Sequence, residues 1–222
     1  TCTIMSSTNT ASDELKQILD SEYYNHKRNI IDIESVRNLL TQVSEDLRYE
    51  LLSSVKNRVG YTVLTLAAGR GHTELCVTLL SSLPPADRLK LILVNKRTAL
   101  HWAAYRGYTE TVSGILDCLT AEQQLQLLLT QNNAGNTALH NAAQEGHMET
   151  VKILLDNLTP DQQLKLLSVQ NNTGKTASQL AAAIKQKETE KMLKKYERDA
   201  DSEVNYGKWG NYYVMTENRG LN

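Results

Sequence analysis

The chain contains no phenylalanine, and its aromatic residues make up only 5% of the 222 residues. A core with so few rings has to be built from leucine, alanine, valine and isoleucine, which favours helices over a β-sandwich. The formal net charge is −1, so no global field points to nucleic acid or to a membrane surface. The longest apolar run, around residues 89–94, is far shorter than the roughly 18 residues that a spanning helix needs.

Cysteine is also scarce. Cys2, Cys76 and Cys118 are an odd number with no CxxC spacing, which argues against a disulfide framework and against a zinc site. We therefore expect a reducing, cytoplasmic compartment. Residue 1 is Thr rather than Met, so an excerpt and a processed form both fit, and secretion after loss of a signal peptide stays open.

The sequence repeats itself along most of its length. TALHWAA begins at Thr98, TALHNAA at Thr137 and a decayed copy, TASQLAA, at Thr176, so these copies start 39 residues apart. An earlier copy, TVLTLAA, begins at Thr62, which lies 36 residues before Thr98. Self-similarity at a fixed period is the signature of a repeat architecture.

Each copy opens a unit of three short helical stretches. The threonine is a capping residue for the first stretch, and its alanines let a neighbouring helix approach closely. A glycine such as Gly107 or Gly146 follows, where a left-handed conformation is easiest. The second stretch carries apolar residues at helical spacing, as in Val151, Leu154 and Leu155.

A leucine-rich third stretch completes the unit. Thr159, Pro160 and Gln162 supply a capping threonine, a proline at the first helical position and a glutamine three residues after the cap. Thr120 and Gln123 form the same capping box without the proline. Helices this short are not stable alone, so each must stack on its counterpart in the next unit, and the product is a solenoid.

The run T-A-L-H-x-A-A-x-x-G-H resembles the ankyrin repeat, whose signature includes T-P-L-H-x-A. The resemblance covers about residues 57–197, with a period longer than the 33 residues of the family. The extra residues lie in the leucine-rich stretch, so we expect an all-α ankyrin-repeat solenoid with an additional short helix per repeat and degenerate capping repeats. Val63, Ala99, Ala138 and Ala177 replace the proline of the family signature, and a helix accepts them readily.

These patterns divide the chain into a stack with two ends. A predicted helix from Asp13 to Tyr24, with Leu15 on its apolar side, begins an N-terminal cap. The expected order is a flexible N-terminus at 1–12, capping helices with a degenerate repeat at 13–56, repeats at 57–94, 95–131, 132–170 and 171–198, and a disordered tail at 199–222.

Some residues invite a catalytic interpretation that the repeat makes unnecessary. His101 and His140 stand at a fixed motif position, where the resemblance implies a structural hydrogen-bonding role between repeats, and no carboxylate or cysteine lies at ligand spacing. Gly60, Gly135 and Gly174 are single glycines in turns, without the spacing of a phosphate-binding loop. We therefore predict no catalytic residue, no metal and no cofactor.

In the ankyrin family, partners usually dock on the turn tips and on the exposed side of the first helix. The first two repeats place arginine and tyrosine together there, a combination typical of interface anchors. One hypothesis is therefore a partner with acidic character, and the alternative is that these charges only solvate the surface. The predicted partner-binding residues are Arg58, Tyr61, Arg70, Arg97, Tyr105, Arg106, Asn133, Asn136, Gln144, Glu145, Asn172 and Lys175.

The function that the resemblance implies is protein–protein recognition by a scaffold or adaptor rather than catalysis. We expect a monomer that binds a protein partner on its concave face and turn tips, and that binds neither nucleic acid nor membranes. Two alternatives stay open. In the first, the chain is the regulatory ankyrin segment of a larger enzyme or receptor. In the second, it is an effector directed at a host protein.

Overall fold

A computed structural model describes residues 10–18 and 33–217 of the chain. Over this part the backbone forms helices and turns, with no strand, so the predicted all-α solenoid is confirmed. An N-terminal helix at 10–18 is followed by α2 (Ile33–Gln42) and α3 (Glu45–Ser54). Three triplets come next: α4 (Val63–Arg70), α5 (Thr73–Ser81) and α6 (Pro85–Ile92); α7 (Ala99–Arg106), α8 (Thr109–Asp117) and α9 (Ala121–Leu128); α10 (Ala138–Glu145), α11 (Met148–Asp156) and α12 (Pro160–Leu167). The last elements are α13 (Ala177–Ala183) and α14 (Lys187–Glu217).

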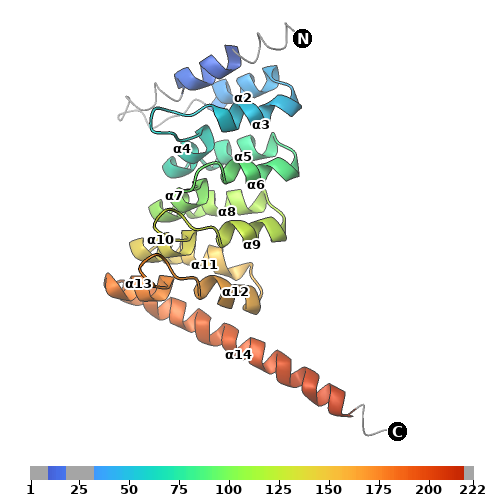
Figure 1. The fold of residues 1–222 in the computed structure, drawn as a ribbon, viewed down its shortest axis with the longest axis vertical. Helices are drawn as coiled ribbons and strands as arrows, with labels where there is room; N and C mark the ends of the chain where they lie inside the picture. The colour runs from blue at the N-terminus through green and yellow to red at the C-terminus, as the bar shows by residue number, and fades with distance from the viewer. Residues whose placement is uncertain (1–9, 19–32, 218–222) are drawn as a thin grey trace.

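The helices stack into an elongated array, with the N-terminal helix at one end and α14 at the other (Figure 1). The first helices of the units, α4, α7, α10 and α13, lie one above the next and pack directly in that order. The second helices, α5, α8 and α11, form a parallel column in the same way. Each unit therefore buries its apolar faces against its neighbours, as a solenoid must.

The residues of the motif explain where each first helix begins and ends. The Thr98 hydroxyl accepts a hydrogen bond from the His101 amide and caps α7. Gly107 ends the helix with φ 71°, a left-handed conformation that a side chain resists. Ala103 and Ala104 are fully buried between neighbouring helices. The motif is thus a short helix with a built-in start, stop and contact face.

The extra helix of each unit is the leucine-rich stretch. Thr120 and Gln123 form the predicted capping box at the start of α9, and Thr159 and Gln162 form the same box at the start of α12. Pro160 occupies the first helical turn, where its missing amide costs nothing. In these two repeats the additional helix is therefore specified by its own cap.

One hydrophobic core runs the length of the stack, from Leu15 in the N-terminal helix to Leu193 in α14. Leu64, Leu100 and Leu139 are fully buried at equivalent motif positions. Burying each such leucine contributes about 2 kcal/mol, so the units are held together mainly by this repeated contact.

The N-terminal cap differs from the prediction at its start. Residues 10–12, expected to be flexible, already belong to the first helix, and Ala11 is 4% exposed because it joins the core beside Leu15. Residues 1–9 and the second half of the predicted helix, 19–24, lie outside the described residues.

The predicted disordered tail is the larger correction. Helix α14 continues to Glu217 and extends past the rest of the stack (Figure 1). Leu193 and Ala200 are both buried and lie seven residues apart, which places them on one face of the helix. The apolar pattern therefore continues beyond the point where the repeat stops. Residues 218–222 of the predicted tail lie outside the described residues.

Candidate partner-binding surface

The turns that lead into α4, α10 and α13 share a construction based on asparagine. The Asn57 side-chain oxygen accepts hydrogen bonds from the amides of Val59 and Tyr61, at 3.1 and 2.9 Å. Asn132 and Asn171 make the equivalent bonds in their own turns. Gly60, Gly135 and Gly174 close the three turns with φ between 71° and 88°. These glycines are therefore turn residues, as predicted.

A buried histidine ties each of two first helices to the next turn. The His101 ring contacts the Thr98 hydroxyl at 2.8 Å through Nδ1 and the Asn136 carbonyl at 2.9 Å through Nε2. His140 repeats this arrangement with Thr137 and with the Lys175 carbonyl. A carbonyl oxygen can only accept, so Nε2 carries the proton and Nδ1 accepts from the hydroxyl.

The environment keeps both imidazoles neutral. Burial lowers the pKa of His101 to about 4, although the bond to the Asn136 carbonyl opposes this, and Arg97 lowers the pKa further. Burial also lowers the pKa of His140. Both histidines are thus engaged in holding the stack, and the described part of the chain holds no group of three or more His, Cys, Asp or Glu side chains placed to bind a metal.

Arginine and aromatic side chains gather where α4 and α7 meet their turns. The Arg97 guanidinium carbon lies 3.7 Å from the ring centre of Trp102 and 5.1 Å from that of Tyr105. Arg106 lies 5.9 Å from the same Tyr105 ring. Trp102 contacts Tyr61 and Tyr105 edge to face, with ring centres 5.7 and 6.3 Å apart. We call these five residues the Arg-aromatic cluster.

The two cations of the cluster carry no internal counter-charge. Neither Arg97 nor Arg106 forms an ion pair with any described carboxylate, and the Arg97 Nε is buried without a hydrogen-bond partner. The Trp102 indole nitrogen is likewise buried and unpaired among the described residues. Stacking on rings holds the guanidinium groups in place without neutralising them, so the cluster presents positive charge to a ligand.

Two hollows share this cluster. One, of about 380 Å³, is lined by Tyr61, Thr65, Leu66, Gly69, Arg70, Trp102, Arg106 and Tyr108. The other, of about 360 Å³, is lined by Arg97, Tyr105, Asn132, Asn133, Ala134, Asn136, Asn141 and Gln144. No carboxylate lines either hollow.

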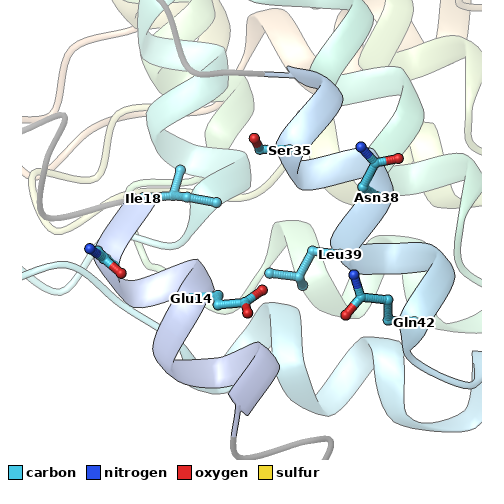
Figure 2. Close-up of a pocket in the computed structure, with 7 residues that line it drawn as sticks. Glu14, Ile18, Ser35, Asn38, Leu39 and Gln42 are labelled. Atoms are coloured by element: carbon cyan, nitrogen blue, oxygen red, sulfur yellow. The ribbon is translucent and has the colours of Figure 1, made fainter.

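A third hollow, of about 470 Å³, lies between the N-terminal helix and α2 (Figure 2). Glu14 and Ile18 face it from the N-terminal helix, and Ser35, Asn38, Leu39 and Gln42 line it from α2. None of the predicted partner-binding residues lies there.

The structure brings most of the predicted partner-binding residues together and leaves others apart. Tyr61, Arg70 and Arg106 line the first hollow, and Arg97, Tyr105, Asn133, Asn136 and Gln144 line the second. Arg58, Glu145, Asn172 and Lys175 line neither.

Sequence reasoning missed Trp102, which is the centre of the cluster. It also missed Leu66 and Asn141, which line the two hollows. These three residues occupy the variable position x of the T-A-L-H-x-A-A motif. This position differs from repeat to repeat inside an otherwise repeated helix, and that variation was the signal that the sequence offered.

The chain shows no described helix with the length and hydropathy needed to cross a membrane. A comparison with curated proteins gives no match. Among solved structures, a chain in the crystal structure of the yeast ribosomal protein Rps3 in complex with its chaperone Yar1 is similar, with a TM-score of 0.51 and 29% identity over 60% of this chain and 91% of that chain. The family model for ankyrin repeats in three copies matches residues 28–126 and 120–206. The chain therefore belongs to the ankyrin-repeat family.

Proposed function

We propose that this chain is a scaffold or adaptor that recognises an acidic segment of a partner protein through the Arg-aromatic cluster. The observation that carries the proposal is the pair of guanidinium groups, Arg97 and Arg106, held over aromatic rings with no carboxylate partner among the described residues. A rigid stack that displays uncompensated arginine beside tryptophan and tyrosine has the composition of an interface centre.

The chemistry of the cluster suits a carboxylate ligand. Guanidinium binds carboxylate with two parallel hydrogen bonds, and the rings fix its plane before the ligand arrives. Arg97 and Arg106 both lie over the Tyr105 ring, so this one ring orients both guanidinium groups before a ligand binds. The entropy that binding would otherwise remove from these side chains is thus already partly lost.

The similar structure supports a protein ligand in general terms only. It is a complex of a ribosomal protein with its chaperone, so a chain of this kind takes part in a protein assembly there.

The test is a charge reversal at the cluster. Arg97→Glu with Arg106→Glu is compared with Lys165→Glu and Lys195→Glu, two exposed lysines outside both hollows. Binding is measured by fluorescence anisotropy against a library of labelled 15-residue peptides that are matched in length and vary in Asp and Glu content. We expect affinity to rise with acidic content in the wild type and in the lysine variant, and to fall at least tenfold in the arginine variant.

Equal affinity of the arginine and lysine variants for the acidic peptides would refute the proposal. Circular dichroism of each variant separates loss of binding from loss of fold. Both arginines lie partly or largely on the surface, so we expect their reversal to leave the helical signal intact.

A further inference from the structure

One connection between repeats is shorter than the others. Eight residues separate Leu128 from the capping Thr137, and eight separate Leu167 from Thr176. Only five residues separate Ile92 from Thr98. The second repeat therefore lacks three residues at its turn tip, and this deletion accounts for its 36-residue offset.

Full-length tips lock to one another. The Asn172 amide donates to the Ala134 carbonyl at 3.1 Å, and the Asn172 side chain donates to the Asn133 carbonyl at 3.0 Å. The Asn171 side chain adds a bond to Asn136 Oδ1 at 2.9 Å. The tip at 171–175 thus offers its Asn172 amide to the tip before it in the stack.

The shortened tip breaks this chain of pairing. Asn133 occupies the position in its turn that Asn172 occupies in the next, but the preceding tip does not reach it. The Asn133 amide accordingly has no acceptor among the described residues, and Asn133 is exposed. The second hollow, of about 360 Å³, lies at this place, with Arg97 on its wall.

We propose that an extended segment of the partner protein fills the notch left by the missing tip. A main-chain carbonyl of that segment accepts from the Asn133 amide, as the Ala134 carbonyl accepts from Asn172, and an adjacent Asp or Glu side chain pairs with Arg97. This inference rests on the proposed function and adds to it the binding position and the extended form of the ligand.

The lining of the notch fits a peptide. Side-chain amides of Asn136 and Gln144 can donate and accept, which suits a peptide backbone with both kinds of group. Arg97 is the one cation among the lining residues, which suits a single carboxylate rather than a run of phosphates. The ligand that the lining of the notch favours is therefore an extended acidic peptide.

The first test isolates one hydrogen atom. Asn133 is the second residue of a turn closed by the Gly135 amide and the Asn132 carbonyl, a position that favours proline. Asn133→Pro removes the amide hydrogen and keeps the turn, and Asn133→Ala is the matched control that keeps the amide. The probe is a blocked di-glutamate peptide, N-acetyl-Glu-Glu-N-methylamide, titrated while amide and Arg Nε–H shifts are followed by NMR.

We expect the probe to shift the Asn133 amide and the Arg97 Nε–H in the wild type. Its affinity should stay within twofold in Asn133→Ala and fall at least fivefold in Asn133→Pro. A shift at Arg97 and Arg106 without one at Asn133, or equal affinity of the two variants, would overturn the notch while leaving the proposed function standing. No shift at any cluster residue would overturn both.

A second variant tests the notch as a space. Replacing residues 93–97 with the eight residues LTQNNAGR restores a full-length tip and keeps the arginine before Thr98. We expect at least a tenfold loss of probe affinity, whereas the same three-residue lengthening of the turn at 171–175 should change affinity less than twofold. Inorganic phosphate and blocked di-glutamine serve as further ligands. If either one shifts Asn133 as strongly as di-glutamate, the notch is not selective for an acidic peptide and the inference fails.

Discussion

The glycine that ends α7 gives the sharpest test of how the stack is held. Gly107 has φ +71°, and a Cβ built there would lie 2.6 Å from Nδ1 of His147. That ring comes from the next repeat, where its Nε2 donates to the Tyr105 carbonyl at 3.1 Å. Gly107→Ala therefore imposes two penalties, a left-handed alanine and a displaced histidine.

The two penalties can be separated with Gly174. It has the same φ of +71°, but a Cβ there meets nothing within 4 Å. A left-handed residue with a side chain costs about 1–2 kcal/mol, so Gly174→Ala should lose about that much stability. Loss of the His147 bond adds about 1 kcal/mol in Gly107→Ala, and the disturbed packing adds to it, for a total of about 2–4 kcal/mol.

Urea unfolding followed by far-ultraviolet circular dichroism measures both variants. With a slope of about 2 kcal/mol per molar urea, the midpoints should fall by about 0.5–1 M for Gly174→Ala and about 1–2 M for Gly107→Ala. A double variant with His147→Ala removes the clash, so its loss should be smaller than the sum of the two single losses. Equal midpoints for the two glycine variants, or strict additivity in the double variant, would refute the argument.

Three further predictions follow from other positions. Burial holds the pKa of His101 near 4, below its ordinary value of about 6.5, so the folded protein disfavours protonation of this ring. The contribution of His101 to the free energy of unfolding, about 3 kcal/mol, is therefore fully present above pH 6.5 and is lost as pH falls toward 4. Unfolding midpoints in the wild type should drop over that range more steeply than in His101→Gln. Lys185 has φ 67° at the end of α13, so Lys185→Gly should raise the free energy of unfolding by about 1 kcal/mol, measured by thermal and urea denaturation, and no gain would contradict the strain. Burial raises the pKa of the Cys76 thiol to about 12, so iodoacetamide at pH 8 should modify the half-buried Cys118 well before it, as peptide mass mapping would show.

Local rules predicted the helices well because the caps are local. The threonine caps, the two capping boxes at Thr120 and Thr159 and the left-handed glycines each involve residues within four positions of one another. Lys185 marks where such a rule gives way. It occupies the position of Gly146 and takes the same left-handed conformation without being glycine, because the final repeat keeps its packing on α14.

The candidate surface was harder to predict because it depends on contacts between repeats. Arg97 and Tyr105 could be expected to be exposed, but Trp102 joins them only once α7 is stacked on α4. The tail escaped prediction for a related reason. The buried Ala200 is a small residue among charged ones, and its place on the apolar face is visible only once α14 is known to begin before it.

Within the motif, some residues are fixed by stacking and one differs between repeats. This difference explains why stability and recognition can vary separately in this chain. Thr98, His101 and the alanine pair are buried and fixed by the stack, so a change there acts on every interaction with the next repeat. The residue between them is tryptophan in one repeat and leucine or asparagine in others, although its neighbours hardly change. The repeat pattern therefore does not fix the identity of Trp102, and the shortened tip beside it is not needed to cap α7, because Thr98 caps that helix. Trp102 and the shortened tip lie together on one surface, beside the cations Arg97 and Arg106. The repeat pattern does not require either feature, so binding of a ligand explains them most directly.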